Sequence, residues 1–275
     1  MERLQAAIEK AREQRKSRQP NSNDRVPVSS GPDDPNSVQM AWLELPEIKL
    51  RPRSLLHNRV PAFQNGPAAA PYDILRTRFI QQAKANNWRR IAVVSPHSNC
   101  GKTTTVVNLG FGLARQGEIR SIALDFDLRR GRLGRLLRQK SSVPMADVLQ
   151  GQVPFSQVGW RYGEKLIFGL GHGSSPKSSE ILQATSTKTV LENIEAAYRP
   201  DFMIFDMPPL SASDDNLGFL TQVDAALIVT EAERTTLTQI DVAERQVAEL
   251  TNVMGVVLNK CRYVSGAYGY EKGYY

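Results

Sequence analysis

The chain has 275 residues, 41% of them hydrophobic, and a formal net charge of +7. This length supports one sizeable core, and no segment approaches the roughly eighteen consecutive apolar residues of a membrane span. We therefore expect a soluble protein, and because the charged N-terminal sequence lacks the apolar run of a secretory signal, we expect it in the cytoplasm. Two cysteines, Cys100 and Cys261, make neither a disulfide framework nor a metal-ligand cluster.

The positive charge is concentrated in two stretches. Residues 1–20 hold six Lys or Arg against three Glu, and residues 128–140 hold six more without an acid, so the remainder of the chain is close to −2. Local basicity favours anionic contacts at two places over a general nucleic-acid binder, so we expect no nucleic-acid partner. A solvated basic face explains either stretch equally well.

The N-terminal quarter differs in composition from the rest. Residues 1–16 have a helical pattern with a thin apolar stripe, which suits docking on a partner or fraying. Residues 17–71 are rich in Pro, Ser, Asn and Gly, and they predict a flexible arm with a short apolar anchor around Trp42.

From Tyr72 onward, helical and strand patterns alternate. Helices are expected at 72–87, 101–117, 145–151, 188–198 and 236–250, and strands at 89–94, 120–125, 165–170, 201–206, 225–230 and 254–259. Such alternation predicts an α/β fold with a mostly parallel sheet, helices on both faces and ligands at the carboxyl ends of the strands.

The stretch "SPHSNCGKTTT", residues 95–105, lies between a predicted strand and a predicted helix. Gly-Lys-Thr at the start of a helix suits phosphate binding, because backbone N–H groups point at the anion, Lys102 reaches the phosphates and the Thr103 hydroxyl holds Mg²⁺. The usual spacing asks for a glycine where this chain has Pro96, and the tripeptide alone is common. Its place between strand and helix is what makes it informative.

Two further strands end in carboxylates at the same edge of the predicted sheet. "IALDFDLRR" carries Asp125 and Asp127, and "FMIFDMPPL" carries Asp206 before a Pro-Pro turn that stops the strand. One strand ending in Asp would mean little. Three such segments, in the order lysine loop, Asp-x-Asp and Asp-x-Pro-Pro, predict carboxylates that complete a Mg²⁺ shell beside a phosphate.

The C-terminus is rich in tyrosine. Five of the eight tyrosines fall in the last thirteen residues: Tyr263, Tyr268, Tyr270, Tyr274 and Tyr275. A sticky terminal tail is one interpretation. After a phosphate-binding core, we favour a cluster of phosphorylation sites, because phosphate adds negative charge and changes what the segment binds.

These segments together resemble the bacterial tyrosine kinases (BY-kinases), the CpsD/CapB-type autokinases of exopolysaccharide and capsule export, in the MinD/ParA-like branch of P-loop proteins. The three quoted motifs correspond to Walker A, Walker A′ and Walker B, and the similarity runs from about Tyr72 to Asn259, including "YDILRTRF" and "GVVLNK". The resemblance implies a P-loop NTPase-like fold. It divides the chain into a short basic helix (1–16), a flexible arm (17–71), a kinase domain (72–262) and a tyrosine tail (263–275).

The resemblance also implies site residues and partners. ATP and Mg²⁺ are the expected cofactors; Lys102 stabilises the transferring phosphoryl group, and Asp125 accepts the tyrosine proton with help from Asp127. The expected metal ligands are Thr103, Asp125 and Asp206, and the expected nucleotide-binding residues are Ser98, Asn99, Cys100, Gly101, Lys102, Thr103, Thr104 and Asn259, the last at the adenine ring. A membrane polysaccharide co-polymerase is expected to activate the kinase and to recruit it to the inner face of the cell membrane.

The chain departs from this family at four places. Asn99 replaces the glycine three residues before Lys102, and asparagine is the residue that best tolerates positive φ there. Cys100 is either a small uncharged filler, which we favour, or an oxidation-sensitive thiol. His97 stands where partition ATPases carry their signature lysine. Of the family's Glu-x-x-Arg-x-x-Arg ring motif only Arg76 remains, since Asp73 and Ala70 occupy the other two positions, so we expect weaker or different self-association.

Two other functions are compatible with parts of the sequence. The altered loop and ring motif favour an ATP-dependent regulatory switch of polysaccharide assembly without tyrosine phosphorylation, whereas the tyrosine tail favours the autokinase. An electron-transfer ATPase of the nitrogenase iron-protein type needs a bridging cysteine pair outside the phosphate loop, which Cys261 alone does not supply.

Overall fold

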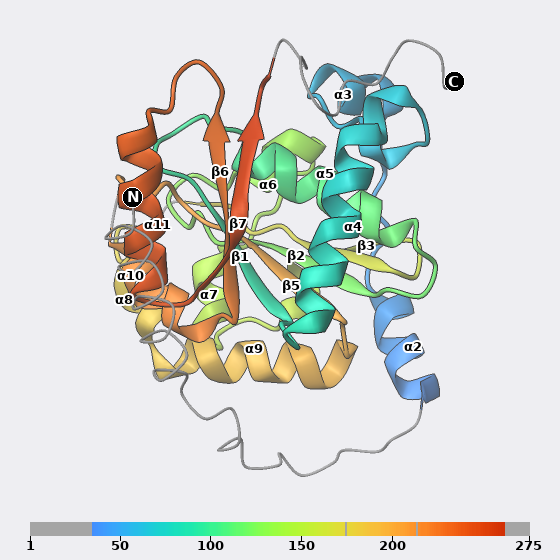
Figure 1. Cartoon of the computed structure of the whole chain (residues 1–275). Helices are drawn as coiled ribbons and strands as arrows, with labels where there is room; N and C mark the ends of the chain where they lie inside the picture. Colours follow the sequence, from blue (N-terminus) through green and yellow to red (C-terminus); the bar gives the residue numbers. More distant parts are fainter. Residues whose placement is uncertain (1–34, 174, 213, 262–275) are drawn as a thin grey trace. The chain divides into compact units, whose positions relative to one another are not determined.

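The computed structural model describes residues 35–173, 175–212 and 214–261. Within them a seven-stranded sheet has the order β3-β4-β2-β5-β1-β6-β7 (Figure 1). The strands are β1 (Arg90–Val94), β2 (Ser121–Asp125), β3 (Gly159–Tyr162), β4 (Leu166–Gly169), β5 (Phe202–Asp206), β6 (Ala225–Glu231) and β7 (Asn252–Asn259). Every pairing is parallel except β3 with β4. The predicted mostly parallel α/β sheet is confirmed.

Helices cover both faces of this sheet. The α-helices are α2 (Pro35–Glu44), α3 (Pro52–His57), α4 (Ala70–Ala85), α5 (Lys102–Ala114), α6 (Arg132–Leu137), α7 (Met145–Leu149), α8 (Ser178–Gln183), α9 (Thr185–Tyr198), α10 (Asp215–Phe219) and α11 (Leu237–Ala248). Single 3₁₀ turns are η1 (Pro61–Phe63), η2 (Pro67–Ala69), η3 (Phe155–Gln157) and η4 (Leu220–Gln222). Among the described residues, no helix combines the length and apolar character needed to cross a bilayer.

Two apolar clusters sandwich the sheet, because successive strand residues point to opposite faces. In β1, Ala92 and Val94 belong to the cluster that includes residues of α2, α7 and α9, whereas Ile91 and Val93 belong to the one that includes residues of α4 and α5. A strand buried on both faces reads as a continuous apolar run, which is why β1 was recognisable in the sequence.

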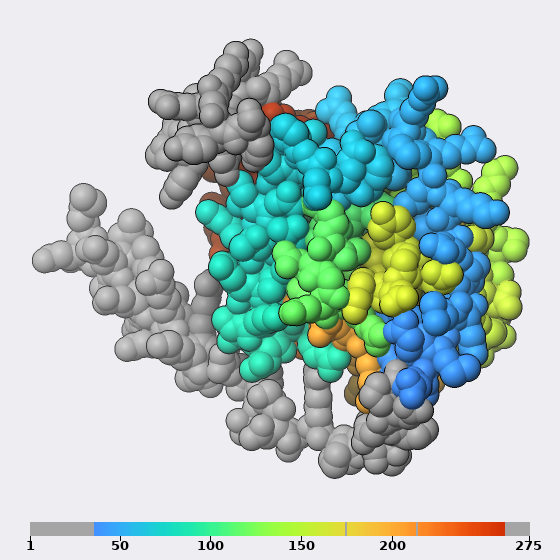
Figure 2. All heavy atoms as spheres, turned by 90° about the vertical axis from the view of Figure 1, so that its right-hand side faces the viewer, coloured from blue at the N-terminus to red at the C-terminus, as the bar shows by residue number. Residues whose placement is uncertain are grey.

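Residues 35–71, expected to belong to a flexible arm, fold onto the sheet and its helices (Figure 2, in blue). Trp42 of α2 is fully buried, its Nε1 donates a hydrogen bond of 2.8 Å to Tyr198 O in α9, and the two rings meet edge to face with centroids 6.3 Å apart. Further along, Ile48 N donates to Arg161 O of β3 at 2.8 Å. Apolar side chains spaced through a Pro-rich segment anchor it, so its composition alone was misleading.

We expect Trp42→Ala to lower the free energy of unfolding by about 3–5 kcal/mol, because it removes a fully buried indole and leaves a cavity. Urea denaturation measures this loss. Leu43→Ala on the same helix is the matched control: Leu43 is 47% exposed, and its truncation should cost less than about 0.5 kcal/mol. Equal effects of the two changes would show that α2 is not docked through Trp42.

Candidate nucleotide-binding site

The phosphate loop joins β1 to α5 and contains two residues in the left-handed region of backbone conformation. Asn99 has φ 69° and Gly101 has φ 98°, so the expectation that Asn99 takes over a glycine-like conformation is confirmed. A Cβ on Gly101 would come within 2.1 Å of Asn259 Nδ2. Only glycine fits at that position without displacing Asn259, because both the φ angle and the space exclude a side chain.

Lys102 opens α5 with its side chain folded into the loop. It is 8% exposed, and its Nζ donates a hydrogen bond of 2.9 Å to Ser95 Oγ, which itself donates to His97 O at 2.7 Å. Burial lowers the pKa of Lys102, while the negative charge of Asp206 opposes that shift. A buried ammonium beside a helix N-terminus is a strong site for an anion. Ser95, which positions this ammonium, was missed as a site residue by the sequence analysis, although it begins the quoted motif.

Asp125 and Asp206 end two neighbouring parallel strands and are direct register partners. Each is 1% exposed. Burial raises the pKa of Asp206 to about 6 even though Lys102 opposes the shift, and burial together with the charge of Asp206 raises the pKa of Asp125 well above its usual range. Two carboxylates this close and this buried are costly to ionise without a compensating cation.

The unmet hydrogen-bonding capacity of this pair fits a divalent cation. Leu133 N donates to Asp125 Oδ2 at 2.8 Å, but Asp125 Oδ1 and both carboxylate oxygens of Asp206 are buried without a well-formed hydrogen bond among the described residues. The Thr103 hydroxyl is a nearby donor to Asp206 and partly offsets the rise in its pKa. Thr103 follows Lys102 at the first turn of α5. Carboxylate and hydroxyl oxygens are the ligands that Mg²⁺ prefers, so Asp125, Asp206 and Thr103 suit the predicted metal.

Asp127 and two arginines lie at the same edge. Asp127 is 5% exposed, and burial raises its pKa while Arg130 and Arg132 counteract the rise. Arg130 Nη1 lies 3.5 Å from Ser98 Oγ, and Arg132 Nη1 lies 3.3 Å from Asn99 Oδ1. For these two arginines, this placement favours contact with an anion over a solvated basic face.

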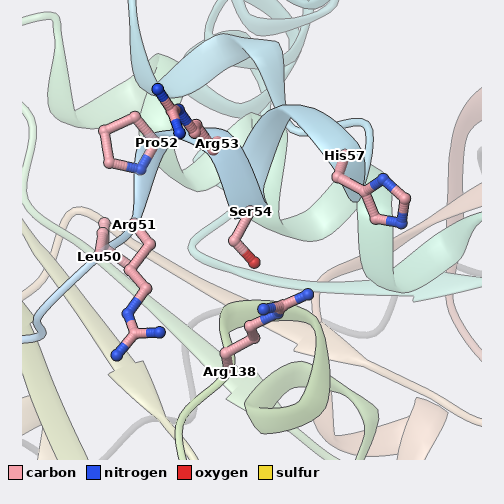
Figure 3. A pocket seen from close by; sticks show the side chains of 7 residues that line it. All are labelled: Leu50, Arg51, Pro52, Arg53, Ser54, His57 and Arg138. Atoms are coloured by element: carbon pink, nitrogen blue, oxygen red, sulfur yellow. The ribbon is translucent and has the colours of Figure 1, made fainter.

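Not every basic residue of that segment reaches the loop. Arg129 Nε instead lies 3.3 Å from Asp215 Oδ2 and donates to Ser178 Oγ at 2.9 Å. Arg138 lines a separate hollow of about 590 Å³ with Arg51, Arg53 and His57 of the α3 segment (Figure 3). None of the predicted site residues lines this hollow.

Asn259, at the end of β7, holds the loop from the other side. Its Nδ2 donates to Cys100 O at 2.8 Å, and its Oδ1 accepts from Lys260 N at 2.8 Å. The adenine contact stays a prediction, as do the nucleotide contacts of Ser98, Cys100 and Thr104. The tyrosine cluster and the helix expected at 1–16 lie outside the described residues.

Comparison with known proteins agrees with this geometry. The model of the ParA family, described as NUBPL iron-transfer P-loop NTPase, matches residues 87–274. The protein named "Putative tyrosine-protein kinase AmsA" of Erwinia amylovora is 28% identical over 81% of this chain and 31% of its own length. Tyrosine-protein kinase CpsD of Streptococcus pneumoniae is 26% identical over 68% of this chain and 83% of its own. The chain thus spans about a third of the first relative and most of the second.

The fold matches solved kinase domains. The kinase domain of the Escherichia coli tyrosine kinase ETK superposes with a TM-score of 0.66 over 76% of this chain and 82% of that domain, at 23% sequence identity. At 23% sequence identity, this similarity is evidence for the fold alone. The resemblance to the bacterial tyrosine kinases stated from the motifs is confirmed by these names and folds together.

We expect Asp206→Asn to stabilise the ligand-free chain at pH 7.5 by about 1–3 kcal/mol, since each unit of pKa shift corresponds to about 1.4 kcal/mol. The pKa of Asp206 is about 6 in the folded chain against about 3.9 for an unperturbed Asp. The folded state therefore binds more protons than the unfolded state between these values, and wild-type stability falls as pH rises through them. The gain should shrink as pH is lowered from 7.5 to 5.

Urea denaturation in EDTA at several pH values measures that gain. Asp241→Asn, on the exposed surface of α11, is the matched control and should leave the pH profile unchanged. A gain that grows at low pH would contradict the raised pKa.

Proposed function

The chain belongs to the ParA family of P-loop NTPases, and from this premise we propose that it is a protein-tyrosine autokinase dependent on ATP and Mg²⁺ that regulates exopolysaccharide or capsule biosynthesis. The observation that carries the proposal is the placement of buried Lys102 near the neighbouring buried carboxylates Asp206 and Asp125, three of whose four oxygens lack a hydrogen-bond partner among the described residues. The names of the relatives support tyrosine as the acceptor, and the tyrosine-rich terminus supplies the substrate groups.

In this proposal the loop binds the nucleotide phosphates. Backbone N–H groups of residues 98–103 and the start of α5 face the anion, and Lys102 carries the charge that stabilises the phosphoryl group as it leaves. Arg130 and Arg132 add positive charge at the open side of the loop. When bound, Mg²⁺ supplies neutralisation of the phosphate charge, with Thr103, Asp125 and Asp206 as its ligands directly or through water.

Asp125 is the proposed proton acceptor for the tyrosine hydroxyl. Its pKa is raised by burial and by Asp206, which brings a carboxylate closer to the range in which a general base works at neutral pH. Oδ2 is held by Leu133 N. Asp125 would then contact Mg²⁺ only through water, so that Oδ1 remains available for the hydroxyl proton. Asp127, two residues further along the chain, assists by adding negative charge beside Asp125.

The proposed acceptors are Tyr263, Tyr268, Tyr270, Tyr274 and Tyr275. Asn259 contacts the phosphate loop through Cys100 O, so β7 ends at the edge of the site and the first of these tyrosines, Tyr263, follows only four residues later. The proposal assigns the transfer to the tail of a neighbouring molecule. The resemblance to the bacterial tyrosine kinases also implies a membrane polysaccharide co-polymerase, which in this proposal activates the kinase and holds it at the inner face of the membrane.

We expect Lys102→Met to reduce phosphotyrosine formation by about a hundredfold to a thousandfold, because it removes the charge that stabilises the transferring group. The purified chain is incubated with ATP and Mg²⁺, with and without the cytoplasmic segment of the candidate co-polymerase, and phosphotyrosine is mapped by mass spectrometry. Lys84→Met, an exposed lysine near the end of α4, is the control and should match wild type.

Phosphate on the five terminal tyrosines that disappears in Lys102→Met but not in Lys84→Met supports the autokinase. Nucleotide binding without phosphotyrosine, even when the partner segment is present, would sink the kinase proposal and favour the regulatory switch.

Self-association should be weak, because the remaining charge of the ring motif is engaged within its own chain. Arg76 Nη1 pairs with Asp73 Oδ1 at 2.9 Å, and the Arg76 side chain is 16% exposed; Arg115 pairs with the same carboxylate. We therefore expect a mass that falls on dilution in multi-angle light scattering. A stable octamer at every concentration would contradict this expectation.

A further inference from the structure

The hollow between the α3 segment and the end of α6 gathers basic side chains that the proposed phosphoryl transfer does not use (Figure 3). It has a volume of about 590 Å³, and its lining includes Arg51, Arg53, His57 and Arg138. Arg138 belongs to the basic segment 128–140, whereas the other three precede the phosphate loop in the chain. The fold therefore brings two basic segments together that are far apart in the sequence.

The three arginines of this hollow carry permanent charge that no carboxylate of the described residues neutralises. Arg51, Arg53 and Arg138 are exposed, and none of them forms an ion pair within the described part of the chain. Residues 49–59 contain four Lys or Arg and no Asp or Glu. A concave surface lined by one sign of charge concentrates the electric field and attracts an ion of the opposite sign.

One hydroxyl in the hollow also lacks a partner. Ser54 Oγ is buried and makes no hydrogen bond among the described residues, and in Figure 3 it points across the hollow toward Arg138. A buried hydroxyl without a partner is unfavourable, and a ligand oxygen that accepted its hydrogen would remove that cost. A hydroxyl donor together with planar guanidinium groups is a donor set that suits the oxygens of a phosphate group.

Hydrogen bonds between the two segments hold the walls of the hollow in place. Asn58 Nδ2 donates to Leu136 O at 2.7 Å, and Gln139 Nε2 donates to Lys49 O at 3.0 Å. Arg138 lies between these two contacts with φ 54°, in the left-handed conformation that glycine usually takes at a helix end. The hollow is therefore formed before any ligand arrives, which lowers the entropic cost of binding.

We propose that this hollow is a second anion site, which binds a phosphate monoester through the guanidinium groups of Arg51 and Arg138 and the hydroxyl of Ser54. Leu50 and Pro52 give it an apolar side, which suits an aryl group attached to the phosphate. The aryl phosphate that this chain itself can offer is phosphotyrosine on the terminus of a neighbouring molecule. That source rests on the proposed kinase function, whereas the anion site does not.

The test uses the full chain after phosphatase treatment and a fluorescein-labelled peptide with the sequence of residues 263–275, phosphorylated at the position of Tyr270. Fluorescence anisotropy measures binding. We expect the unphosphorylated peptide to bind at least about tenfold more weakly than the phosphopeptide, because charge-assisted hydrogen bonds to the phosphate supply most of the affinity.

Competition distinguishes the two sources of the phosphate group. Free phosphotyrosine that displaces the phosphopeptide at a lower concentration than inorganic phosphate assigns the site to phosphotyrosine. Displacement by both at the same concentration assigns it to free phosphate, and either result supports a phosphate site.

Variants of the lining residues locate the bound phosphate. Arg138→Gly removes one guanidinium and suits φ 54°, so the turn is kept; it should weaken phosphopeptide binding about tenfold, as should Arg51→Gln. Ser54→Ala should weaken it about threefold. The matched control is Arg135→Gln, which makes the same change of charge at an exposed position of α6 outside the hollow and should bind like wild type.

Three outcomes would each overturn the proposal: equal binding of the two peptides, equal effects of Arg138→Gly and Arg135→Gln, and loss of binding in a folded Lys102→Met chain. The last result would place the phosphate in the nucleotide loop instead. Because the peptide carries its phosphate before it is mixed with the chain, no kinase activity is needed, so failure of this site and failure of the kinase proposal are distinguishable.

Discussion

The candidate site of this protein depends on the unfavourable burial of two carboxylates at the carboxyl ends of neighbouring parallel strands. Asp125 and Asp206 are register partners, each 1% exposed, and Lys102 is the buried cation beside them. One ammonium does not satisfy two carboxylates, and three of their oxygens have no hydrogen-bond partner in the described part of the chain. The folded protein therefore holds buried charges that are unfavourable on their own and that a phosphate–metal pair would compensate. A structural salt bridge, in contrast, is already neutralised by its own partners.

The rest of the fold makes that arrangement possible. Strands β1, β2 and β5 are buried on both faces, so their ends are fixed by two apolar clusters. The loop after β1 is held by Asn259 Nδ2 on Cys100 O and by the exclusion of any side chain at Gly101. Rigid strands and a tight loop keep the charges at fixed positions, and fixed charges stabilise a transferring phosphoryl group without reorganisation during the reaction.

Much of this architecture was predictable because it is encoded locally. A continuous apolar run ending in Asp identifies a buried parallel strand, and Gly-Lys-Thr after such a run identifies the phosphate loop. The glycine-like conformation of Asn99 was predictable from the tolerance of asparagine for positive φ. Strand β3 was missed because it is short and its residues are mostly half-buried at the antiparallel edge, which leaves little apolar periodicity to detect.

What escaped prediction arises from contacts between segments far apart in the chain. The docking of residues 35–71 depends on Trp42 meeting Tyr198, and neither residue signals the other in the sequence. Ser95 was missed for another reason: it lies only seven residues before Lys102, but its bond to the Lys102 ammonium depends on how the loop folds.

Two residues that differ from the family's phosphate loop are also explained by contacts with a distant segment. His97 and Cys100 looked like isolated substitutions, yet β6 places Glu231 beside both. His97 Nε2 lies 2.9 Å from Thr235 Oγ1, which also accepts from Glu231 N, so the loop is tied to the segment after β6 by a contact that sequence order does not reveal.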